Sequence, residues 1–258
     1  MTSSEEVVED IYLHDVKSGK MVLETAVGSE VDFGPSEDEE VEKLEFFQSL
    51  VDNVYEDIEQ EGIRSGEGVY GTLACFEGYF DGWVGDTVDR ISNCSAIVSE
   101  YLDEAGEESV VTVSELGERL SQYGAEVEYE ASSEVEIEAD RGLAMAFNTL
   151  GVNQEEHTSE GTDWYAEFNV EEDELRVEVC DNGTGLESYA GEEIFQKGVG
   201  DGSGKGLYLA RRLIEVNDGS IGYSPDISNE GGFGLEIEVP LSTEHRTLSR
   251  EETSSEVR

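Results

Sequence analysis

Acidic residues alternate with apolar residues along most of this chain, and this pattern limits what the chain can fold into. The 258 residues include 63 Asp and Glu but only 15 Lys and Arg, which gives a formal net charge of −48 at pH 7. A charge this large is typical of disordered chains. Here, however, 37% of the residues are hydrophobic, and they recur at helical or strand spacing. We therefore predict folded elements whose exposed faces are acidic.

The charge also indicates the salt concentration in which the protein works and the partners it can bind. Strong screening makes such a surface tolerable in concentrated salt, so we expect a halophilic protein; an acidic mesophilic protein is the alternative. Non-specific nucleic-acid binding is not expected, because phosphate contacts need Lys and Arg. The sequence contains no apolar stretch of membrane-spanning length, and its N-terminal MTSSEEVVED is too acidic for a signal peptide. We expect a cytoplasmic protein without a membrane span.

The spacing of the apolar residues divides the chain into four parts. Two alternating runs flank KSGK, so residues 1–36 are predicted as a β-hairpin and linker. Residues 37–108 are predicted as a helical hairpin, because apolar residues there form stripes at helical spacing. Residues 109–243 alternate strands with helices, and residues 244–258 are a polar tail. The first helical stripe consists of Leu44, Phe47, Val51, Val54 and Ile58.

These parts together predict an α+β protein. Residues 109–243 should form a two-layer α/β sandwich, in which a mixed sheet carries helices on one face, and the helical hairpin should precede it. The apolar stripes of the hairpin exceed what two helices can cover by themselves. We therefore expect residues 41–102 to form a homodimer or to dock a partner.

Two glycine clusters and one asparagine carry the chemistry predicted for the sandwich. In DNGTGL, at the end of a predicted strand, the Asp181 carboxylate can accept a hydrogen bond from an exocyclic amine, while Gly183 and Gly185 let the backbone approach a flat ligand. GSGKGLYLA opens a predicted helix, whose free N–H groups suit phosphate. Asn153 offers a neutral oxygen to Mg²⁺.

Two of the few lysines, Lys197 and Lys205, lie near the second glycine cluster, where they would supply positive charge to a triphosphate. The cluster is not a P-loop, because neither Ser nor Thr follows Lys205 and no buried strand precedes it. The glycines of this cluster are Gly202, Gly204 and Gly206.

In this order, the motifs resemble those of the ATP-binding domain of sensor histidine kinases, in a wider family that includes DNA gyrase B, Hsp90 and MutL. LGVNQEEHT resembles the N box, DNGTG the first glycine box, EEIFQKG the phenylalanine box, and GSGKGLYLA the second glycine box. With the acidic composition, the resemblance is to a halophilic archaeal type. It covers residues 110–241 and implies that the domain binds ATP and Mg²⁺.

The resemblance also implies a role for each matching residue. Asp181 would bind the adenine amine, Asn153 would ligate Mg²⁺, and His157 would contact the phosphates. Gly204 and Gly206 would lie against the phosphates, and Phe195 would anchor the base of the lid. The remaining residues expected at the nucleotide are Gly183, Gly185, Lys197, Gly202, Lys205 and Leu207.

The sequence departs from the family at two positions near the nucleotide. Glu156 occupies a place where the family usually has Lys or Arg, and an acid there opposes a triphosphate. Thr149 occupies the place of the general-base Glu of the hydrolysing members, which argues against gyrase-like hydrolysis.

The third departure concerns the acceptor of the phosphoryl group. In the family, this histidine lies on the first helix of the dimerising hairpin and is followed by an acid, but residues 41–102 contain no histidine. The chain's three histidines are His14, His157 and His245. His14 precedes Asp15 but falls in the predicted β-hairpin, so the sequence predicts no acid-labile label from γ-labelled ATP.

Three functions remain open. The first is an ATP-binding signal-transduction protein of two-component type, which phosphorylates or regulates a partner such as a response regulator. The second is a non-catalytic pseudokinase that acts as a nucleotide-dependent binding module. The third is a serine kinase resembling anti-sigma factors, although such proteins rarely have so long a helical segment before the domain.

Overall fold

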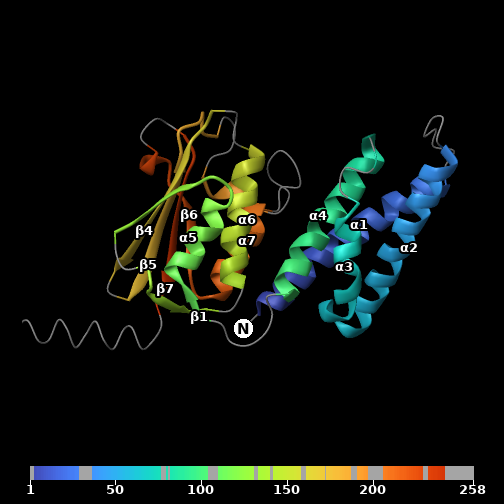
Figure 1. Cartoon of the computed structure of the whole chain (residues 1–258), viewed down its shortest axis with the longest axis horizontal. Helices are drawn as coiled ribbons and strands as arrows, with labels where there is room; N and C mark the ends of the chain where they lie inside the picture. The colour runs from blue at the N-terminus through green and yellow to red at the C-terminus, as the bar shows by residue number, and fades with distance from the viewer. Residues whose placement is uncertain are drawn as a thin grey trace, which may run out of the picture. The chain divides into compact units, whose positions relative to one another are not determined.

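The chain divides into a helical unit, Glu5–Ala105, and an α/β unit formed by Gly106–Arg258 with Met1–Ser4. In this computed structural model each unit has its own buried core. Figure 1 shows the helices of the first unit and the sheet and helices of the second. The structure describes residues 3–28, 37–76, 80, 82–103, 110–130, 133–139, 142–157, 161–171, 173–186, 191–196, 206–228 and 232–241. The predicted polar tail and the linker at 29–36 lie outside these residues.

The described residues of the helical unit form three long helices and one short helix. They are α1 (Ser4–Gly28), α2 (Glu37–Glu61), α3 (Glu67–Ala74) and α4 (Gly82–Asp103), with a 3₁₀ turn at Ile63–Gly66. The predicted stripes of α2 and α4 form its core; in α2, for example, Phe47, Val51 and Val54 are fully buried. Within the described part of the chain, none of the helices combines the length and apolarity needed to cross a membrane.

The prediction of a β-hairpin in residues 1–36 is wrong, because residues 4–28 form α1. The alternating runs around KSGK are one helical stripe, in which Val8, Ile11 and Tyr12 are buried. The glycine in KSGK is not a turn residue. A Cβ at Gly19 would meet the end of the Ile91 side chain of α4, so Gly19 lies where these two helices approach closely.

Polar contacts join α1 to the rest of the helical unit. The hydroxyl groups of Tyr12 and Ser95 share a buried hydrogen bond of 3.2 Å, and the rings of Tyr12 and Tyr70 pack edge to face with centroids 5.1 Å apart. Because α1 contributes its own buried face, the stripes of α2 and α4 do not depend on a second chain for cover. The structure therefore removes the reason for expecting a homodimer or docking site at residues 41–102.

The α/β unit is built on a five-stranded mixed sheet. Its strand order is β2-β4-β5-β7-β6, in which β2 pairs with β4 in parallel and all other pairs are antiparallel. A separate two-stranded sheet joins β1 (Val110–Thr112) to β3 (Glu136–Glu138). The five strands are β2 (Glu126–Tyr129), β4 (Trp164–Glu171), β5 (Glu174–Asp181), β6 (Ser220–Tyr223) and β7 (Gly234–Pro240).

Three helices, α5 (Val113–Ser121), α6 (Gly142–His157) and α7 (Gly206–Val216), cover one face of this sheet (Figure 1). Two 3₁₀ turns lie at Gly191–Phe195 (η2) and Pro225–Ile227 (η3). In β5, Leu175, Val177 and Val179 are buried, whereas the intervening residues are half-buried on the other face. The predicted α+β class, a two-layer sandwich with a mixed sheet and helices on one face, preceded by helices, is confirmed.

Candidate functional site

Asp181 is the last residue of β5, and its side chain follows those of the buried, helix-facing residues of that strand. Only 9% of its surface is exposed. One carboxylate oxygen, Oδ1, accepts hydrogen bonds from the backbone N–H groups of Gly183 at 2.9 Å and Phe233 at 3.0 Å. The other, Oδ2, accepts one from Nε2 of Gln154 at 2.7 Å. All three partners are donors, so the carboxylate acts as an acceptor and its orientation is fixed.

Three glycines, Gly183, Gly185 and Gly232, shape the backbone around Asp181. A Cβ at Gly183 would lie 3.1 Å from Oδ1 of Asp181, and Gly185 has a φ of 66°, which favours glycine. At Gly232, a Cβ would collide with the main-chain oxygen of Asp181. Ser228 stabilises this contact, since its hydroxyl donates to that oxygen at 2.9 Å and accepts from the Gly232 N–H at 2.8 Å.

Asn153 belongs to α6, and its side chain lies against the N-terminus of α7. It is one residue before Gln154 on α6, and α6 packs against α7. A Cβ at Gly206, the first residue of α7, would lie 2.8 Å from Oδ1 of Asn153. The Asn153 oxygen therefore sits against the helix end where free N–H groups and the helix dipole favour anions.

This arrangement fits a magnesium ion shared with phosphate groups. A neutral amide oxygen is a hard ligand of the kind Mg²⁺ prefers, and the phosphates at the α7 N-terminus would complete the coordination. Because Gly206 has no Cβ, the Asn153 amide can lie against the start of α7. Asn153 is the residue that would hold the ion, and the ion would supply charge neutralisation to the phosphates.

Phe195 is buried at the end of η2, where it anchors that turn to α7. The Arg211 guanidinium lies over its ring at 5.2 Å and donates to Glu192 at 2.7 Å and Glu215 at 2.9 Å. Glu215 and, to a smaller extent, Glu192 raise the pKa of Arg211 above its usual value, so its cation is retained. Phe195 thus has a structural role at the start of the segment predicted as a lid.

The structure brings four of the predicted site residues into contact: Asp181 with Gly183, and Asn153 with Gly206. Gln154 connects the two pairs, because it follows Asn153 on α6 and donates a hydrogen bond to Asp181. Leu207, the second residue of α7, is half-buried. Four predicted residues lie outside the described part of the chain: Lys197, Gly202, Gly204 and Lys205. His157 ends α6, and only its backbone is described.

The sequence-based prediction missed Gln154, Ser228 and Gly232. Gln154 sits within the predicted N box, but a glutamine in a helix carries no signal of its partner across the fold. The GG pair before β7 was a visible sign that the backbone there approaches another group closely. Nothing in the local sequence indicates that this group is the carbonyl of Asp181, 51 positions earlier in the chain.

Cys180 precedes Asp181 in β5 and lies on the face of the sheet away from the helices. In the register of the two strands it pairs with Tyr165 of β4. Burial, and then the charges of Asp181, Glu178 and Glu167, raise the pKa of the Cys180 thiol above its usual value. The thiol therefore stays protonated near neutral pH and offers no nucleophile next to the site.

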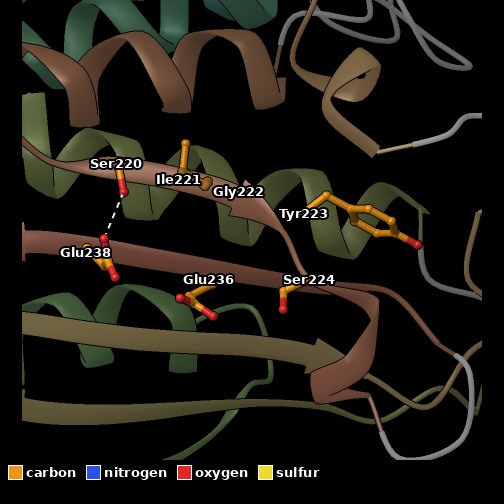
Figure 2. A pocket seen from close by; sticks show the side chains of 7 residues that line it. All are labelled: Ser220, Ile221, Gly222, Tyr223, Ser224, Glu236 and Glu238. Carbon is orange, nitrogen blue, oxygen red and sulfur yellow. Dashed lines mark hydrogen bonds between the residues drawn. The ribbon is translucent and has the colours of Figure 1, made fainter.

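A shallow hollow of about 250 Å³ lies on the other face of the sheet, along β6 and β7 (Figure 2). Glu236 and Glu238 line it and alternate along β7 with the buried residues of the helix-facing side. Figure 2 shows the Glu238 carboxylate paired with the Ser220 hydroxyl, at 3.3 Å. The residues that line this hollow include none of those around Asp181, and its acidic lining opposes phosphate.

The site thus combines the buried acceptor Asp181, at the end of β5, with Asn153, which lies against the N-terminus of α7. Such a site suits a ligand that has a hydrogen-bond donor at one end and anionic groups at the other. Residues 138–243 match the family model described as "Histidine kinase-, DNA gyrase B-, and HSP90-like ATPase". This match spans less than half of the 258-residue chain, so it characterises the domain and leaves the helical unit unassigned. A comparison with curated protein sequences gave no match.

Solved structures of histidine kinases are similar to part of the chain. The catalytic domain of histidine kinase ThkA is 22% identical, with 53% of this chain and 98% of that one covered and a TM-score of 0.43. The ATP-binding domain of PrrB from Mycobacterium tuberculosis is 18% identical, with 53% and 100% covered and a TM-score of 0.43. Full-length ShkA in complex with AMPPNP is 20% identical, with 69% and 43% covered and a TM-score of 0.43. Similarity at this level says nothing of function.

Gly206→Ala is expected to weaken the magnesium-dependent part of nucleotide binding by about tenfold. The new methyl group would displace the Asn153 oxygen, which lies 2.8 Å from the Cβ position, and so cost the ion a ligand. Titration calorimetry with ATP in the presence of Mg²⁺ or EDTA measures this. Gly71→Ala, in helix α3 with its closest neighbour at 3.9 Å, is the control and should change nothing. An unchanged magnesium dependence in Gly206→Ala would remove Asn153 from the metal site.

Proposed function

We propose that the α/β unit binds ATP with Mg²⁺ and that the chain is a signal-transduction protein related to sensor histidine kinases. The observation that carries the proposal is the Asp181 carboxylate, buried at a strand end and held as an acceptor by three N–H donors. An acceptor in this state suits the exocyclic amine of adenine. At the other end, Asn153 and the start of α7 suit Mg²⁺ and phosphates.

The predicted residues outside these contacts complete the proposed site. Gly202 and Gly204 would let the backbone approach the phosphates, and Lys197 and Lys205 would supply positive charge. His157, at the end of α6, would reach the phosphates as well. Leu207 and Gly185 would line the pocket.

Titration calorimetry in molar KCl tests the proposal. ATP with Mg²⁺ should bind with a dissociation constant between roughly micromolar and millimolar. Adenosine should bind more weakly, because it lacks the groups that Asn153 and the α7 N-terminus would hold. If folded protein binds no adenine nucleotide under these conditions, the assignment of the site is wrong.

A kinase function is favoured by the position of His14. The correction of residues 4–28 to a helix puts this histidine on a long helix that precedes the ATP-binding domain in the chain. His14 is exposed, whereas Ile11, Tyr12 and Val16 of the same helix are buried. An exposed imidazole on such a helix can meet a γ-phosphoryl group, which it could not do from a buried position.

In the proposed reaction, an imidazole nitrogen of His14 attacks the γ-phosphorus of ATP. The new P–N bond forms as the bond to the bridging oxygen breaks, and ADP leaves. The imidazole proton passes to a base, for which Asp15, the next residue, is the candidate. The phosphoryl group would then pass to a partner signalling protein such as a response regulator, within the cytoplasm.

The alternative function is a pseudokinase that binds ATP and regulates a partner without transferring phosphate. Two sequence observations favour it: Glu156 stands where a cation would help the transition state, and residues 41–102 contain no histidine. A serine kinase would share the site and differ only in its acceptor. Labelling from γ-labelled ATP distinguishes the three functions, because phosphohistidine is acid-labile and phosphoserine is acid-stable.

The protein is expected to need molar salt to fold. The formal charge of −48 leaves strong repulsion among carboxylates in dilute buffer, and screening removes it. Circular dichroism across a KCl titration should show loss of helical signal as the salt falls below about 0.5 M. Cooperative folding in dilute buffer would contradict the halophilic assignment.

A further inference from the structure

The side chain of Gln154 is buried in the α/β unit, although its neighbour Asn153 faces the α7 N-terminus. Only 7% of the surface of Gln154 is exposed, and its Nε2 donates to Oδ2 of Asp181 over 2.7 Å. A buried amide held against a carboxylate is costly to desolvate, and this bond to a charged acceptor offsets that cost. Helix α6 therefore contacts both ends of the proposed site through consecutive residues.

The bond from Gln154 changes what Asp181 can offer a ligand. Backbone N–H groups already occupy Oδ1, so Oδ2 is the oxygen through which a ligand is bound, and Gln154 fixes its direction. With a donor already in place, Oδ2 presents a remaining lone pair and repels a ligand oxygen. A purine with a 6-amino group fits this arrangement, and a purine with a 6-oxo group does not.

We propose that Gln154 is a positioning residue that sets the preference of the site for 6-amino over 6-oxo purine nucleotides. This role rests on the proposed ATP binding and assigns part of its specificity to a residue outside the direct ligand contacts. Without the Gln154 amide, a water molecule takes the place of the donor on Oδ2. A water can turn and donate to a 6-oxo oxygen, so the discrimination falls even though Asp181 is retained.

The test compares ATP with inosine triphosphate, which carries a 6-oxo group in place of the amine. Calorimetry in molar KCl with Mg²⁺ measures both affinities for the wild type, Gln154→Leu and Asn148→Leu. Asn148 is the matched control, since it is also a buried amide of α6, and its Oδ1 accepts from the Tyr123 hydroxyl at 2.9 Å, away from Asp181. Thermal unfolding of each variant reports the structural cost of losing the amide.

The wild type should prefer ATP by about tenfold or more, and Gln154→Leu should reduce that preference to about twofold. Asn148→Leu should lower the melting temperature but leave the preference unchanged. The proposal is overturned if Gln154→Leu keeps the wild-type preference, or if Asn148→Leu lowers it as much. A wild type that binds neither nucleotide would overturn the proposed function and this role with it, whereas a retained preference in Gln154→Leu would leave ATP binding standing.

Discussion

Asp181→Asn is expected to weaken ATP binding by about 1–3 kcal/mol, which is roughly 5- to 150-fold in the dissociation constant. The N–H groups of Gly183 and Phe233 hold an oxygen at the Oδ1 position, so the new amide nitrogen must take the place of Oδ2. There it presents a donor to the adenine amine, which is itself a donor. The change therefore replaces an attraction with a repulsion at the point where the base is recognised.

The fold should survive this substitution. The Gln154 amide can turn so that its oxygen accepts from the new amide nitrogen, which keeps both buried groups paired. Calorimetry with ATP measures the loss of affinity, and circular dichroism checks that the variant is folded. ATP affinity equal to that of the wild type, in a folded Asp181→Asn protein, would show that the carboxylate does not contact the base.

Val51→Asp is expected to unfold the helical unit. Val51 is fully buried in the core of that unit, and its replacement puts an unpaired carboxylate where water cannot reach it. The cost is several kcal/mol, which is comparable with the whole stability of a small domain. Because the helical and α/β units have separate cores, the variant should keep ATP binding while it loses much of its helical signal.

Asn53→Asp is the matched control, since it adds the same charge two positions away on α2 at an exposed residue. Circular dichroism in molar KCl should show native helical content for Asn53→Asp and a marked loss for Val51→Asp. If Val51→Asp has native helical content and melts as the wild type does, the assigned core of the helical unit is wrong. Light scattering of the wild type tests separately whether residues 41–102 form the homodimer that the sequence predicted.

Most of the α/β unit could be predicted from the sequence, because its local patterns agree with the fold. The alternation in β4 and β5 has period two, and β5 ends at Asp181, directly before the first glycine cluster, as predicted. Similarly, α7 begins at Gly206 within the second cluster. These boundaries depend on strand alternation and on glycines before a helix, which are local properties of the chain.

Helix α1 could not be predicted in the same way, because its apolar residues fit two periods over short windows. Val8, Ile11 and Tyr12 lie on one helical face, but the runs on either side of KSGK also alternate. The contact that separates the two possibilities is distant in the chain: Gly19 of α1 lies against Ile91 of α4. Gln154 could not be predicted for the same reason. Its role depends on a hydrogen bond to Asp181, and so on how α6 packs against the end of β5.

Transfer of label from γ-labelled ATP to the protein tests the kinase function. Wild type, His14→Ala and Asp181→Asn are incubated with Mg²⁺ and labelled ATP in molar KCl, and the label is tested for stability in acid and in base. The sequence alone predicts no such label, because it places His14 in a β-hairpin, but residues 4–28 form α1. With His14 on a helix, we predict an acid-labile, base-stable label on the wild type, none on His14→Ala and a strongly reduced amount on Asp181→Asn. A wild type that binds ATP but takes up no label, or a label that persists in His14→Ala, would contradict His14 as the acceptor.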